Sequence, residues 1–142
     1  MAKKAFLVLI CFIGLIIFLS ILNCQGTKRT ITLPSGEVVC DLNGEWDVFV
    51  KNYGPWASFS SYPQMWKITQ TGSSFVAVRM IKDYLHEKGS PAAQGELDKC
   101  NMKKVTILTG GPSITAKGRI SDHGNKIVID DGRMVRVTAT RK

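Results

Sequence analysis

The chemically most versatile side chains of this sequence are four thiols, which belong to Cys11, Cys24, Cys40 and Cys100. There is no Cys-x-x-Cys pair and no Cys/His cluster, so the sequence predicts no zinc site. There is also no Gly-x-Ser-x-Gly elbow, His-Glu-x-x-His motif or P-loop. Both histidines, His86 and His123, lie beside turn residues. We therefore expect a protein that is not an enzyme and that holds no cofactor.

The N-terminal segment is strongly apolar and predicts export. Lys3 and Lys4 precede an 18-residue run, Ala5 to Leu22, that contains no charged residue. A basic start before an apolar run is typical of a secretory signal peptide, although this run is also long enough to span a bilayer. Because the lysines favour the cytoplasmic side, a cleaved signal and an uncleaved anchor both place the rest of the chain outside the cytoplasm.

The next residues indicate how the chain would be attached to a membrane. The segment Ser20–Gly26 resembles a bacterial lipobox, with Ile21 three positions before Cys24. The resemblance implies removal of signal peptide 1–23 and lipidation of Cys24, with palmitate among the acyl chains that hold the protein in the cell envelope. Several acyl chains together make such an attachment stable. In a diderm bacterium, Gln25 after the cysteine implies an outer-membrane lipoprotein that faces the periplasm. The alternative is an uncleaved anchor.

The cysteine count then leaves one pair of thiols in the exported part. Cys11 leaves with the signal peptide and Cys24 carries lipid, so Cys40 and Cys100 remain in an oxidising compartment. We predict a disulfide between them, which would contribute about 4 kcal/mol by loop-entropy reasoning. The alternative is two buried free thiols.

The charge of the exported part is modestly basic. Loss of Lys3 and Lys4 reduces 19 basic residues to 17, against 11 acidic residues, so the net charge falls from +8 to +6. These charges are spread along the chain, which favours a solvated surface over a binding patch, although they would help the domain lie near anionic head groups. We expect no nucleic-acid partner.

The part of the chain that positions Cys40 and Cys100 is predicted to be a β-rich domain at residues 37–142. It follows a polar, lipidated tether at residues 24–36. Turn residues separate short runs with a period of two, which is typical of antiparallel strands that are half in water. Asp83 to Lys88 could form one helical turn. The predicted strands are Trp46–Tyr53, Met65–Thr71, Phe75–Ile81, Ala92–Leu97, Val105–Thr109, Ser113–Ile120, Lys126–Asp130 and Arg133–Thr140.

The predicted fold class is all-β. About eight antiparallel strands in a domain of this size favour an up-and-down barrel, because closure removes unpaired edges. The alternative is a β-sandwich. An eight-stranded barrel has room inside for side chains or for one small ligand.

A Gly-x-Trp motif at the start of the first long strand consists of Gly44 and Trp46. It resembles the opening motif of the lipocalin and wider calycin group. The resemblance implies a lipocalin-like barrel whose closed end is plugged by Trp46, with Arg141 of the last strand as its basic cover. Arg141 shares the parity of Val135, Val137 and Ala139 in that strand. The alternative is an ordinary core tryptophan in another β fold.

The connection between the first two long strands carries aromatic residues at a spacing of three, namely Tyr53, Trp56, Phe59 and Tyr62. This spacing suits one side of a short 3₁₀ turn, and the calycin resemblance implies a lid over the barrel mouth. We therefore expect a binding protein for a small hydrophobic or amphipathic ligand. The alternatives are an envelope protein-binding module, such as an inhibitor or assembly lipoprotein with a filled barrel, a contact with lipid head groups, and rings that only complete the core.

Overall fold

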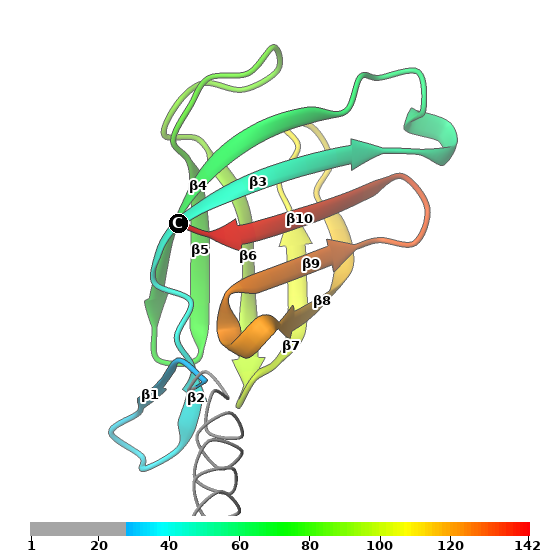
Figure 1. Cartoon of the computed structure of the whole chain (residues 1–142). Helices are drawn as coiled ribbons and strands as arrows, with labels where there is room; N and C mark the ends of the chain where they lie inside the picture. The colour runs from blue at the N-terminus through cyan, green and yellow to red at the C-terminus, as the bar shows by residue number, and fades with distance from the viewer. Residues whose placement is uncertain (1–27) are drawn as a thin grey trace, which may run out of the picture.

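The structure is a computed structural model, and it describes residues 28–142 (Figure 1). The predicted signal peptide, the lipobox and Cys24 lie outside these residues. The described chain contains ten strands and two 3₁₀ turns. In chain order the elements are β1 (Thr30–Thr32), β2 (Val38–Cys40), β3 (Gly44–Asn52), η1 (Gly54–Trp56), β4 (Tyr62–Thr71), β5 (Ser74–Arg79), β6 (Pro91–Asp98), β7 (Asn101–Ile107), β8 (Ile114–Ser121), η2 (Asp122–Gly124), β9 (Lys126–Asp130) and β10 (Val135–Arg141).

Strands β3 to β10 close into one antiparallel barrel of eight strands, which confirms the predicted up-and-down topology. Each strand pairs with its neighbours along the chain, and β10 pairs back with β3 at the seam. The seam register places Val137 opposite Val50 and Arg141 opposite Trp46. Closure leaves no barrel strand at an edge, so the ladders are complete around the barrel.

The inward face of each strand follows from its alternation of residue types. In β10, Val135, Val137 and Ala139 are buried, whereas Arg136 and Thr140 are exposed. The described core cluster takes its side chains from residues 42–139, all within the barrel and the segment just before it. Residues 28–142 therefore contain a closed barrel together with its core, which is what an independently folding unit requires.

The two ends of the barrel differ in their connections. One end carries the short turns β4–β5 and β6–β7, the η2 turn and the β1–β2 ribbon, which extends beyond the strands (Figure 1). We call it the closed end. The opposite end, called the open end, carries the longer connections 53–61, 80–90, 108–113 and 131–134.

The beginning of the described chain is fastened to the closed end. The backbone N–H of Arg29 donates to the carbonyl oxygen of His123 at 3.1 Å, and that of Asp41 donates to the carbonyl oxygen of Arg29 at 3.0 Å. The predicted disulfide is present between Cys40 and Cys100, whose Cα atoms lie 4.8 Å apart. It joins the end of β2 to the β6–β7 turn.

All eight predicted barrel strands occur, and all but Lys126–Asp130 have shifted ends. The strand predicted from Met65 begins at Tyr62, and the strand predicted from Val105 begins at Asn101. The pattern did not predict the β1–β2 ribbon, in which Thr30–Thr32 pairs with Val38–Cys40. Strand β1 lies within the segment expected to be a tether, where the short polar run has no periodicity to reveal it.

The helical turn predicted from Asp83 to Lys88 is wrong, because this stretch contains no helix. The Asp83 carboxylate accepts hydrogen bonds from the backbone N–H groups of Leu85 and His86, both at 2.8 Å. A side chain that binds the following N–H groups stabilises a local turn and competes with a helix. Within residues 28–142, no helix has the length and hydropathy that a membrane-spanning segment needs.

Candidate functional site

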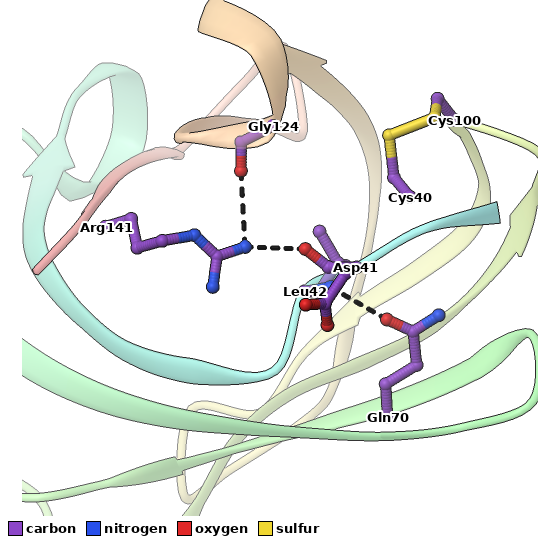
Figure 2. The surroundings of a disulfide bond; sticks show 7 residues. All are labelled: Cys40, Asp41, Leu42, Gln70, Cys100, Gly124 and Arg141. Carbon is purple, nitrogen blue, oxygen red and sulfur yellow. Dashed lines mark hydrogen bonds between the residues drawn. A yellow bond between two sulfur atoms is a disulfide. The ribbon is translucent and has the colours of Figure 1, made fainter. Parts of the chain in front are cut away.

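Trp46 fills the closed end of the barrel. Its side chain is fully buried, and the indole N–H donates to the carbonyl oxygen of Leu42 at 3.0 Å. Leu42 is itself buried, and its backbone N–H donates to the amide oxygen of Gln70 on β4 at 2.8 Å (Figure 2). The segment before β3 is therefore fixed at both its N–H and its carbonyl, and it seals this end.

Arg141 covers the same tryptophan from the last strand. Its guanidinium carbon lies 4.4 Å from the centroid of the Trp46 ring. The guanidinium donates to the carbonyl oxygens of Asp41 at 2.5 Å and Gly124 at 3.3 Å (Figure 2). It also donates to the carbonyl oxygen of Asn43. Burial, with the nearby Arg29 second, lowers the pKa of Arg141.

Gly44 lies against this cover and has a backbone φ of +129°, which strongly favours glycine. A Cβ atom at this position would lie 3.2 Å from Nη1 of Arg141. The structure thus brings together the three residues of the predicted barrel-closing motif. The glycine is needed both for the backbone conformation and for the approach of the guanidinium.

A cavity of about 240 Å³ occupies the open half of the barrel. Most of its wall is apolar, and it is open to solvent at one side. An apolar concavity with few polar groups is the usual form of a small-molecule site. The lining residues used below are Val50, Trp66, Ile107, Val135 and Val137 in the wall, Trp56, Phe59, Tyr62, Tyr84 and Leu85 at the rim, and Gln64, Arg79 and His86 as polar groups.

Three of the four aromatic residues of the predicted lid line this cavity. Trp56 and Phe59 meet edge to face with ring centroids 6.4 Å apart. Tyr62 meets Tyr84 of the next open-end loop in the same way, at 5.5 Å. Trp56, Phe59 and Tyr62 lie in or directly after the connection 53–61, whereas Tyr84 lies in the connection 80–90, so two connections build the rim. Burial, with Asp83 second, raises the pKa of Tyr62 to about 12.

Tyr53 does not line the cavity. Its hydroxyl donates to the carboxylate of Asp130, and a longer contact of 3.4 Å reaches Asp131. Burial and the hydrogen bond to Asp130 raise the pKa of Tyr53 to about 12. Its role is thus to tie the end of β3 to the β9–β10 connection.

A polar cluster on one side of the cavity centres on Asp83. The carboxylate accepts a hydrogen bond from the side-chain amide of Gln64 at 2.9 Å and another from Nδ1 of His86 at 2.9 Å. Burial alone would raise the pKa of Asp83, but hydrogen bonds from Leu85, His86 and Gln64 outweigh it and hold the pKa below its usual range. Asp83 is therefore a buried carboxylate ion at neutral pH.

Arg79 places a positive charge beside this carboxylate. Its Nε atom lies 3.9 Å from Asp83, and both side chains are less than a tenth exposed. The guanidinium also donates to the carbonyl oxygens of Leu108, at 2.7 Å, and Pro91. Burial lowers the pKa of Arg79. The arginine, the last residue of β5, thus contacts the loop after β5, the start of β6 and the loop after β7.

Three polar residues of the cavity, Gln64, Arg79 and His86, are not among those that the sequence pattern predicts for a site. The sequence does carry a signal for Arg79. It alternates with Phe75 and Ala77 on the inward face of β5, where a charged residue is unusual. Gln64 was missed because the strand was predicted to begin one residue later. No local signal identifies His86, since its loop becomes part of the cavity only when the barrel closes.

The fold and the site together define a closed antiparallel barrel with a plugged end and a small, mainly apolar cavity at the other end. Within the described part of the chain, no group of three or more His, Cys, Asp or Glu side chains is placed to hold a metal ion. Comparisons with protein-family models, with characterised proteins and with solved structures find no match for this chain.

Proposed function

We propose that this chain is a lipid-anchored protein of the cell envelope whose lipocalin-like barrel binds one small hydrophobic or amphipathic molecule. The cavity carries the proposal, because the barrel interior is plugged at one end and hollow at the other. Sites of this kind are mostly apolar and largely preformed. The aromatic rim supplies large apolar contact area at the opening.

The arrangement of the ends supports attachment through the N-terminus. The described chain begins at the closed end, where Arg29 is bound to His123. A tether that leaves from there would place the open end on the side of the domain away from its membrane. The cavity would then face the compartment rather than the anchoring bilayer.

Ligand binding is tested by titrating 1-N-phenylnaphthylamine, a fluorescent apolar probe, into residues 28–142. We expect saturable binding that the Val137→Phe variant abolishes, since Val137 is buried in the cavity wall. Val76→Phe makes the same chemical change on the outside of β5, where the side chain is 44% exposed, and should bind as the wild type does. Absence of saturable binding by the wild type would reject the cavity as a ligand site.

The lipid anchor is tested separately in cells. Growth with labelled palmitate should label the full chain, and the Cys24→Ala variant should carry no label. Label that persists in this variant would reject Cys24 as the lipidation site. It would leave the ligand-binding proposal intact, because the two rest on different residues.

A second candidate function is recognition of another envelope protein. The favouring observation is the exposed apolar rim, in which Phe59, Tyr84 and Leu85 are each at least half exposed. The test is a pulldown from envelope fractions with the wild type, with a Tyr84→Glu/Leu85→Glu variant and with Val76→Glu as a control on the barrel side. A partner that binds all three proteins equally would count against the rim as its site.

A further inference from the structure

Two nitrogen atoms at the cavity lack a hydrogen-bond partner within residues 28–142. They are Nε1 of Trp66 and Nε2 of His86, and both atoms are buried. Both residues line the cavity and are less than a tenth exposed. Buried polar atoms are nearly always paired, and an unpaired one costs about 1–3 kcal/mol. Both atoms are themselves covered, so a polar group of a ligand pairs with them, and removes that cost, only after a small movement of the side chains at the wall.

The surroundings of His86 determine what its free nitrogen offers. Nδ1 lies 2.9 Å from a carboxylate oxygen of Asp83, which is ionised and can only accept. Nδ1 must therefore carry a hydrogen. In the neutral imidazole, Nε2 then has a lone pair and accepts a hydrogen bond. The indole N–H of Trp66 can only donate.

The charges in the cluster indicate the charge of the ligand. Arg79 and Asp83 have opposite charges and lie 3.9 Å apart, so they largely compensate each other. Besides Arg79 and His86, the polar side chains of the wall, Asn52, Gln64 and Thr109, carry no charge, and the remaining wall is apolar. Transfer of an ionised group into such a site is costly unless a counter-charge is free to pair with it.

We propose that the cavity selects a neutral amphipathic molecule with a hydroxyl group, an alcohol or phenol, which donates to Nε2 of His86 and whose polar end accepts from Nε1 of Trp66. The proposal rests on the proposed ligand-binding function and names its chemical class. It excludes the carboxylate of a fatty acid as the preferred polar end.

The position of Gly110 adds a steric element to this site. A Cβ atom on Gly110 would lie 3.4 Å from both Cδ2 and Nε2 of His86, and the glycine has a φ of +77°. The loop after β7 therefore passes closely over the imidazole edge without a side chain. A compact hydroxyl group fits beside such an edge better than a branched polar group.

The experiment compares three probes by calorimetry on residues 28–142: 2-naphthol, 2-methoxynaphthalene and 2-naphthoate. The three probes share one ring system and differ only in the polar group. The hydroxyl of 2-naphthol donates and accepts hydrogen bonds, the ether oxygen of 2-methoxynaphthalene only accepts, and 2-naphthoate is an anion. We expect 2-naphthol to bind about tenfold more tightly than 2-methoxynaphthalene, the factor that one net hydrogen bond provides. Binding of 2-naphthoate should be weaker still.

Two variants assign the hydrogen bonds. His86→Asn can keep the bond to Asp83 but removes the Nε2 acceptor, so it should weaken 2-naphthol about tenfold and leave 2-methoxynaphthalene unchanged. Trp66→Phe removes the donor and should weaken both probes. Nitrogen-15 NMR of the wild type provides a test without a variant, because the Nε2 resonance of His86 should shift on addition of 2-naphthol. The resonances of His123, at the closed end, should stay in place.

The outcomes separate the two proposals. If the first two probes bind equally, or if 2-naphthoate binds most tightly, the hydroxyl proposal is wrong and the ligand-binding function stands. An unchanged His86 resonance with bound 2-naphthol also overturns the hydroxyl proposal. If no probe binds, the proposed function fails and the hydroxyl proposal falls with it.

Discussion

The guanidinium carbon of Arg141 lies 4.4 Å from the centre of the Trp46 ring, so the last residue of β10 covers the first inward tryptophan of β3. The two residues are also register partners at the seam where the barrel closes. The contact therefore joins the two ends of the barrel sequence at the plugged end. It couples barrel closure to the sealing segment, because the same guanidinium donates to the carbonyl oxygens of Asp41 and Asn43.

Truncation of Arg141 should weaken the barrel. Arg141→Ala removes a cation–π contact and the hydrogen bonds to three carbonyl groups, and we expect a loss of about 2–4 kcal/mol in the free energy of unfolding. Urea denaturation measures it. Arg136→Ala is the matched control in the same strand, because its side chain is 55% exposed and pairs with Asp130 at the surface. Equal losses in the two variants would contradict the proposed role of the stack.

Reduction of the Cys40–Cys100 disulfide should also lower stability. The bond closes a loop with a sequence separation of 60, for which chain entropy predicts about 4 kcal/mol. Urea denaturation with and without dithiothreitol measures the effect. The Cys40→Ala/Cys100→Ala variant should unfold at the midpoint of the reduced wild type and should not respond to reductant. A wild type that does not respond either would show that the bond contributes little.

The barrel was predictable to a large extent because its strands have local signals. The strands near the end of the chain show a period of two and are bounded by Asp-Gly or Gly-rich turns. The Gly44–Trp46 pair marks the start of the first barrel strand. The cavity was less predictable. Trp56, Phe59 and Tyr62 follow from their spacing, whereas His86 and Gln64 are brought to the cavity wall together by their hydrogen bonds to Asp83. No sequence pattern shows that a loop side chain meets a strand side chain across a closed barrel.

A glycine inside β6 should be intolerant of a side chain. A Cβ atom on Gly95 would lie 2.2 Å from the carbonyl oxygen of Lys104 and 2.8 Å from the Phe75 ring. The carbonyl belongs to a paired strand and cannot move freely, so Gly95→Ala should cost about 1–3 kcal/mol by overpacking. The control is Gly111→Ala, whose Cβ would have no neighbour closer than 3.9 Å and should change stability by no more than about 0.5 kcal/mol. Thermal denaturation compares them, and equal midpoints would contradict the packing at Gly95.

Asp83 should make the stability of the domain depend on acidity. Its pKa is held below the usual value in the folded chain, so its stabilising contribution is present above the unfolded value of about 3.9 and is lost as pH falls through the folded value.

At neutral pH, Asp83→Asn leaves the buried Arg79 without its counter-charge and should cost about 3 kcal/mol. Urea midpoints at pH 7, 5 and 3 measure both effects. We expect the wild type and the variant to differ most at pH 7 and to converge as the pH falls, since protonation of the wild-type carboxyl removes the same charge. Parallel pH profiles would show that folding does not lower the pKa of Asp83, and would contradict the hydrogen bonds assigned to its carboxylate.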